Sequence, residues 1–115
     1  MEKFGYRFSF GPWNIHEGAD PFGPTVRPSV LFDKKVEILK GLGYDAMQFH
    51  DDDVVPDLDK LTATEISKQA RAIRAKLAEH GLGAEFVAPR LWESQMTVVG
   101  AYTANDPKMR QYAID

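Results

Sequence analysis

The 115-residue sequence has no cysteine, which excludes disulfides, thiolate metal ligands and cysteine nucleophiles from this chain. Their absence fits a reducing compartment. No apolar run approaches the roughly 20 residues that a membrane span needs, and the opening sequence MEKFGYRFSFGPW is too polar for a secretory signal peptide. We therefore expect a cytoplasmic protein with no membrane partner.

An excess of positive charge is also lacking. The net charge is -3, and the densest basic stretch is Lys34 and Lys35 followed by Lys40. Nucleic-acid-binding domains concentrate Lys and Arg on one face, so nucleic acid is not an expected partner. The hydrophobic content of 43% and charged content of 27% are those of a globular chain, and the length suits one domain.

Signals for β-hairpins are missing too, and strand and helix patterns alternate along the chain. Such alternation predicts a parallel sheet with right-handed crossovers. Three strand–helix units do not close a barrel, which needs eight units and about 250 residues, so we expect the front of a longer α/β protein. The expected strands cover residues 6–10, where Gly11 and Pro12 stop the strand, 44–50 and 83–89. The expected helices cover residues 30–43 and 62–80, and a third helix opens within residues 103–115.

Two of these helices have clear start signals. Thr62 and Glu65 have the T-x-x-E spacing of a capping box, in which each side chain bonds the backbone of the other residue. Pro107 suits the first turn of the last helix, with Asn105 or Asp106 as its cap. These signals predict the helix starts better than periodicity alone.

Side chains that could carry chemistry follow each expected strand, where functional residues gather in parallel α/β folds. Trp13 follows the first strand, His50 the second, and Arg90 and Trp92 the third. A histidine at such a position suits acid/base or hydrogen-bonding roles, and Asp53 could hold one ring nitrogen and fix its tautomer. Flat tryptophans make an apolar wall for a sugar or another small ligand.

Simpler interpretations remain for the same residues. Three consecutive aspartates repel one another, so residues 51–53 could form a helix cap, a weak cation site or a solvated loop. The tryptophans could be core residues, and His16 and His80 need no role beyond the surface. From the residues alone, the prediction therefore goes no further than a metal or small-molecule site on an α/β scaffold.

Four segments taken together resemble a known family. FSFGPW, DPFG followed by RP, GYDAMQFHDDDVVP and TANDPKMRQYAI are similar, in order and approximate spacing, to the N-terminal third of xylose isomerases of the shorter, actinobacterial-type class. The likeness runs through essentially the whole chain. It implies that residues 1–115 are the N-terminal three βα units of a (β/α)₈ TIM barrel, which is incomplete in this chain.

The resemblance also implies a function. Such enzymes interconvert D-xylose and D-xylulose, or D-glucose and D-fructose, by ring opening and a metal-assisted hydride shift. Two divalent cations, Mg²⁺ or Mn²⁺, would be held by ligands outside this chain, so no metal ligand is expected here. The complete enzyme would be a homotetramer acting on a small sugar, and the 115-residue chain alone would be inactive.

Roles for single residues follow from the same resemblance. His50 matches a histidine that contacts the sugar and assists ring opening, and Asp53 matches the carboxylate that bonds its other nitrogen. Trp13 and Trp92 match aromatic residues of the sugar site. Phe22 matches a phenylalanine that reaches into a neighbouring subunit's pocket, which would explain the long proline-rich loop around it.

Two departures leave the specificity open. Residues 88–92 read APRLW, where the family has small polar residues and an amide, so Arg90 would bring a bulky cation near the far hydroxyls of the sugar. The loop between Trp13 and Phe22 is one residue shorter. The alternatives are a related sugar epimerase or isomerase of altered specificity, a metallohydrolase on the same barrel, and a non-catalytic chain that needs a second polypeptide to complete the barrel.

Overall fold

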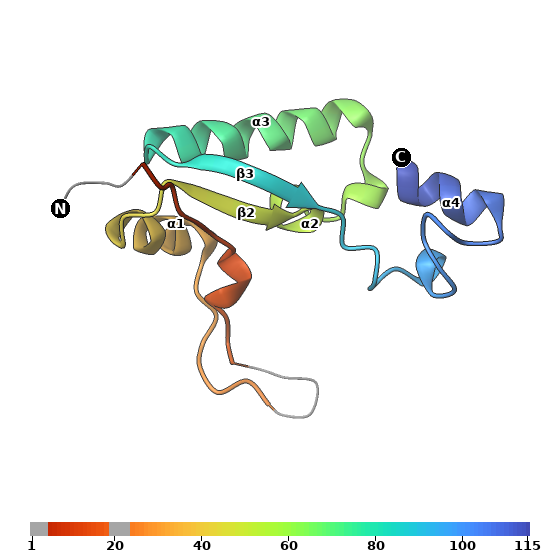
Figure 1. Ribbon diagram of the computed structural model, residues 1–115, viewed down its shortest axis with the longest axis horizontal. Helices are drawn as coiled ribbons and strands as arrows, with labels where there is room; N and C mark the ends of the chain where they lie inside the picture. The colour runs from red at the N-terminus through yellow and green to blue at the C-terminus, as the bar shows by residue number, and fades with distance from the viewer. Residues whose placement is uncertain (1–4, 19–23) are drawn as a thin grey trace.

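The computed structural model describes residues 5–18 and 24–115. They contain a parallel three-stranded sheet in the order β1-β2-β3 (Figure 1), which confirms the expected alternation. The strands are β1 (Ser9–Phe10), β2 (Ala46–His50) and β3 (Gly83–Ala88). The α-helices are α1 (Phe32–Gly41), α2 (Asp51–Val54), α3 (Ala63–Glu79) and α4 (Pro107–Ile114), and the 3₁₀ helices are η1 (Pro12–Asn14), η2 (Leu58–Lys60) and η3 (Gln95–Thr97).

The first strand is shorter than predicted at its start, because only Ser9–Phe10 pairs with β2. Its predicted end at Gly11 and Pro12 is confirmed: Pro12 begins η1, and proline has no N–H to contribute to a sheet. At the start, the amide of Phe8 donates to the side chain of Asp45 at 3.1 Å rather than to a neighbouring strand. A contact between distant residues therefore replaces the strand ladder there.

The predicted helix caps are confirmed. The Thr62 hydroxyl accepts a hydrogen bond from the Glu65 amide at 3.3 Å, and the Glu65 carboxylate accepts from the Thr62 amide at 2.8 Å. The Thr62 hydroxyl and amide lower the pKa of Glu65 by donating to its carboxylate. At α4, Asp106 is the cap, since its carboxylate accepts from the Lys108 amide at 2.8 Å.

Replacing Thr62 by Ala should destabilise the chain by about 1 kcal/mol, the usual cost of losing an N-cap side chain. Thr62→Ser keeps the hydroxyl and should stay close to the wild-type stability. Urea denaturation followed by circular dichroism measures both values. If both variants lose the same free energy, the methyl group of Thr62 matters and the cap does not.

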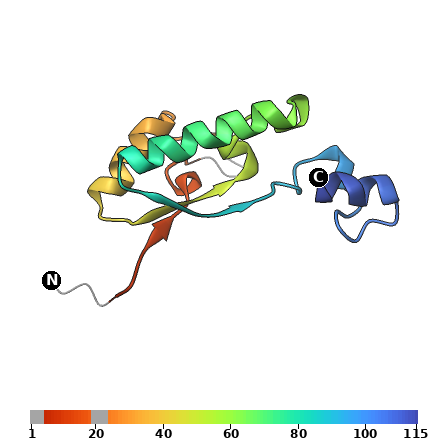
Figure 2. The ribbon, with the colours of Figure 1, turned by 90° about the horizontal axis from the view of Figure 1, so that it is seen from above.

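The core lies on one face of the sheet. Val36 and Leu39 of α1, Met47 and Phe49 of β2 and Leu77 of α3 are all fully or almost fully buried in one cluster. Met47 and Phe49 are two residues apart on a strand, so they point to the same side of the sheet. Both helices therefore pack on that side, as Figure 2 shows.

The opposite face of the sheet carries no α-helix in the described part of the chain and has a polar layer, formed by Ser9, Gln48 and Glu85. The Gln48 amide donates to the Ser9 hydroxyl at 2.7 Å and to the Glu85 carboxylate at 2.9 Å. Ser9 also donates to Glu85. The hydrogen bonds that Ser9 and Gln48 donate lower the pKa of Glu85, and Ser9 has the larger effect. One polar residue from each strand thus joins the layer.

The described chain is extended for its length. Its radius of gyration is 16.7 Å, against about 13 Å for a compact domain of 100 residues, and α4 lies apart from the sheet (Figure 1). Many large apolar side chains are exposed, among them Phe8, Leu31, Leu42, Val87, Trp92, Val98 and Val99. Across residues 5–18 and 24–115, no helix combines the length and apolar character needed to cross a membrane.

Candidate functional site

The candidate site lies at the carboxyl end of β2, around His50. This residue follows the buried Phe49 on β2, so its side chain points to the side of the sheet opposite α1 and α3. The His50 side chain is 15% exposed. The ring centroid of Trp13, after β1, is 4.5 Å from the His50 ring. The ring of Trp92, after β3, is 5.1 Å away and almost perpendicular to it. The structure therefore brings all three strand ends together.

The two tryptophans flank His50 without belonging to the core. Trp92 is 64% exposed and Trp13 is half-buried, so the core alternative is wrong for Trp92. The Trp13 ring folds back against Gly11, where a Cβ atom would collide with it. Glycine at this position is what permits the ring to reach His50.

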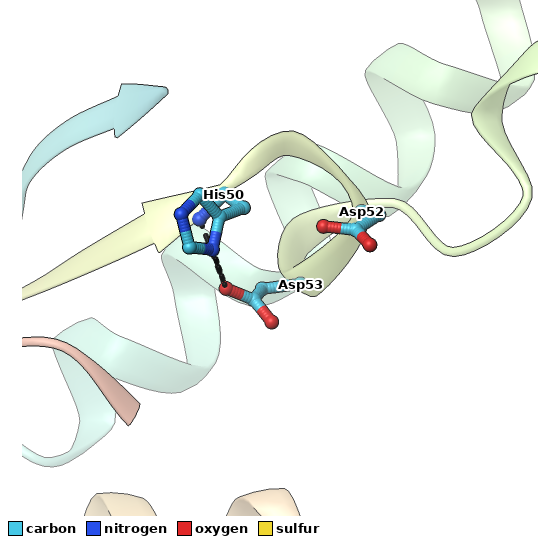
Figure 3. Close-up of side chains that lie close together, drawn as sticks. All are labelled: His50, Asp52 and Asp53. Atoms are coloured by element: carbon cyan, nitrogen blue, oxygen red, sulfur yellow. Dashed lines mark hydrogen bonds and ion pairs between the residues drawn. The ribbon is translucent and has the colours of Figure 1, made fainter. Parts of the chain in front are cut away.

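Asp53 acts first as a helix cap. The chain turns from β2 directly into α2, and the carboxylate of Asp53 accepts a hydrogen bond from the His50 amide at 2.9 Å. The same carboxylate oxygen lies 3.4 Å from Nδ1 of the His50 ring (Figure 3). The predicted proximity of His50 and Asp53 is confirmed, and so is the capping alternative for the aspartate run.

The other two aspartates are not solvated loop carboxylates, which corrects that alternative. Asp51 accepts a hydrogen bond from the backbone amide of Arg90 at 2.9 Å and so ties the end of β2 to the end of β3. Asp52 accepts from Nε of the Arg90 side chain at 2.8 Å. Each carboxylate has a partner supplied by the neighbouring strand end.

Arg90 therefore offsets part of the negative charge of the cluster. Besides Asp52, its guanidinium group contacts Nδ1 of His50 at 2.9 Å, Asp53 at 3.7 Å and Glu93 at 3.4 Å. Partial burial acts to lower the pKa of Arg90, but the hydrogen bond to Asp52 and the nearby carboxylate charges outweigh it and raise the pKa. The side chain is 22% exposed, and its guanidinium carbon lies 5.6 Å from the ring centroid of Trp92.

The inward position of Arg90 was not predicted from the sequence. Its place just after the third strand was predicted. The strand order offered one further signal for its contact with the aspartates. Parallel strands in sequential order bring residues after β2 beside residues after β3, so a cation after β3 lies within reach of carboxylates after β2. Three adjacent carboxylates repel one another unless a nearby positive charge offsets the repulsion, and Arg90 supplies one such charge.

The residues present do not fit a divalent cation. In the described part of the chain, His50, Asp52 and Asp53 have potential ligand atoms within 4.8 Å of one another. However, the guanidinium group of Arg90 already bonds both His50 and Asp52. A divalent cation here would lie against a permanent positive charge. The site for the two cations implied by the resemblance is therefore not formed by these residues.

A cavity of about 690 Å³ adjoins the site between η2, the segment after β3 and α4, and Asp51, Asp52 and Arg90 are among the residues that line it. Tyr112 of α4 donates a hydrogen bond to Asp59 at 2.8 Å across it. Neither His50 nor the two tryptophans line this cavity. The candidate site is thus the open surface around the His50 ring.

Three remaining predictions concern other residues. Phe22 lies outside the described residues. His16 accepts a hydrogen bond from the Gly18 amide at 2.9 Å, and His80 caps the end of α3, so both have local roles.

No known protein-family model matches this sequence.

Proposed function

We propose that this chain is part of a sugar-converting enzyme of the aldose–ketose isomerase class, built on a (β/α)₈ barrel. Within that class, the xylose isomerase type fits best, acting on D-xylose or D-glucose. The observation that carries the proposal is the position of His50 at a strand end, between the rings of Trp13 and Trp92. The sequence resemblance supports the same conclusion.

The sheet supports the barrel part of the proposal. Its strands follow in sequential order, and α1 and α3 cover the same face. Repeated eight times, this arrangement closes into a barrel with all helices outside, whereas a doubly wound sheet has helices on both faces. The polar layer would then face the barrel interior, and further strands would continue from the edge of β3.

The site suits a sugar in its pyranose form. Aromatic rings pack against the C–H faces of sugars, while a polar group between them bonds an oxygen. Among the described residues, the polar contacts of the His50 ring are made through Nδ1. Nε2 is therefore the ring atom left for a ligand held between the tryptophans.

Ring opening is the step that these residues can promote. Nε2 of His50 gives its proton to the ring oxygen as the bond between C1 and that oxygen breaks. In the same step, water takes the proton of the hydroxyl on C1, which becomes the aldehyde oxygen, and returns a proton to Nε2, so the imidazole is neutral before and after the ring opens. The later hydrogen transfer from C2 to C1 needs groups that the described residues do not provide.

The direct test is product analysis with the protein purified from its source. With Mg²⁺ or Mn²⁺ present, ¹³C NMR should show D-xylulose formed from labelled D-xylose, and EDTA should abolish this conversion. The isolated 115-residue chain is the matched control and should form no product. A source protein that forms an epimer of the sugar and no ketose would support the epimerase alternative. Hydrolysis of a phosphoester without any sugar conversion would support the metallohydrolase.

The exposed surface also favours a second candidate, a subunit that needs another polypeptide to complete its barrel. Val87 on β3 is 51% exposed, and Leu31 before α1 is 79% exposed. Native mass spectrometry of the source protein separates the two. A single chain near three times 12.9 kDa would support a continuous barrel, whereas two chains of different mass would support the subunit.

A further inference from the structure

The contact between Arg90 and His50 determines which nitrogen of the imidazole carries the proton. Nη2 of Arg90 lies 2.9 Å from Nδ1 of His50. A guanidinium group only donates hydrogen bonds and is not deprotonated in proteins. Nδ1 must therefore accept, and a neutral imidazole with an accepting Nδ1 has its proton on Nε2.

Asp53 does not reverse this assignment. Its Oδ2 atom is 3.4 Å from Nδ1, which is beyond the usual hydrogen-bond distance of about 2.7–3.2 Å. The same oxygen accepts from the His50 backbone amide at 2.9 Å. In this arrangement the oxygen makes the capping bond and lies beyond hydrogen-bond distance of Nδ1, to which Arg90 donates.

The guanidinium group is fixed in this position from several directions. Asp52 accepts from Nε at 2.8 Å, and Asp51 holds the Arg90 backbone amide at 2.9 Å. Glu93 lies 3.4 Å from Nη1. These contacts hold the guanidinium group in place beside the His50 ring.

We propose that Arg90 is a positioning residue that holds His50 in the Nε2-protonated tautomer, so that the ring presents a hydrogen-bond donor between Trp13 and Trp92. The ligand class that matches is a neutral molecule with an ether or hydroxyl oxygen, such as a cyclic sugar. Only the identity of this ligand rests on the proposed function. The tautomer itself is a property of these described contacts.

The proposal changes the roles expected from the sequence. The sequence predicts that Asp53 accepts a hydrogen bond from one ring nitrogen of His50 and so fixes the tautomer; the nitrogen held in this way would carry the proton. In the structure, the hydrogen bond to Nδ1 comes from Arg90 and not from a carboxylate. Because Arg90 donates, Nδ1 is the acceptor and Nε2 carries the proton. His50 then starts the reaction as a proton donor, and Arg90 acts on a sugar only through His50.

The test is NMR of the ¹⁵N-histidine-labelled source protein at about pH 8, where an ordinary imidazole is neutral. Long-range ¹H–¹⁵N correlation spectra distinguish the two tautomers, and His50→Gln assigns the signal. We expect a protonated Nε2 and an unprotonated Nδ1 for His50. A protonated Nδ1 in the wild-type protein would overturn the proposal without any variant.

Two variants test whether Arg90 is the cause. Arg90→Met removes the donors but keeps an apolar stem, so we expect Nδ1 of His50 to become protonated in most or all molecules. Arg90→Lys keeps a donor and should restore at least part of the Nε2 form. The signals of His16 and His80 are internal controls for the fold. If they are unchanged and the His50 spectrum of Arg90→Met is also unchanged, Arg90 does not set the tautomer.

These results are independent of turnover. A protein that shows the expected tautomer but converts no sugar would contradict the proposed function and leave the role of Arg90 in place. A protein that converts sugar with a protonated Nδ1 on His50 would contradict the role of Arg90 alone. The two proposals therefore fail in different ways.

Discussion

Replacing His50 by Asn in the enzyme with a complete barrel should lower kcat on the cyclic sugar by about 100-fold or more. General acid catalysis contributes about 10²–10⁴-fold, and an amide can bond the ring oxygen but cannot give it a proton. On an analogue that is already open, the loss should be much smaller, because no ring has to be broken. Steady-state kinetics on the two substrates measure the difference.

His16→Asn is the matched control for this experiment. His16 bonds the Gly18 amide within its own loop, so its loss should leave both rates near the wild-type values. Circular dichroism should show that all three proteins have the same helix content. Equal losses on the cyclic and the open substrate would mean that His50 acts after ring opening or only holds the site together.

Replacing Phe49 by Ala should destabilise the chain by about 3–5 kcal/mol, the usual cost of truncating a buried phenylalanine. Phe49 is fully buried, and it packs with Leu39 of α1 and Leu77 of α3 on the same face of the sheet. Its loss would leave a cavity beneath both helices. Because small domains have a total stability of about 5–15 kcal/mol, the variant should be near unfolding.

Phe86→Ala on β3 provides the comparison. It removes the same atoms from the neighbouring strand, but Phe86 is 44% exposed, so the cost should be well below that of Phe49→Ala. Chemical denaturation of the 115-residue chain compares the two directly. Equal costs would show that the face of β3 is buried in solution, as it would be in an assembly of several chains.

The elements that the sequence predicted best are those with local signals. The capping box of Thr62 and Glu65 lies within four residues, and Pro107 marks the first turn of α4 by its own geometry. The start of β1 could not be predicted in this way. It depends on Asp45, which is 37 residues from Phe8 in the chain and takes the amide that would have extended the strand.

In the candidate site, too, some features could be predicted from the sequence and others could not. The meeting of Trp13, His50 and Trp92 followed from their places after three parallel strands, which is a rule of topology. The direction of Arg90 did not follow from any rule of that kind. It is set by charge–charge contacts with Asp52 and Glu93, and these depend on side-chain rotamers that strand order leaves open.

The placement of the tryptophans has an optical consequence. The chain has two tryptophans, and the rings of both Trp13 and Trp92 lie about 5 Å or less from the His50 ring. Its tryptophan fluorescence, excited selectively over that of the four tyrosines, therefore comes from the candidate site itself. Emission spectra report the surroundings of His50 without a label, and each of the two rings can be isolated by a single Trp→Phe substitution.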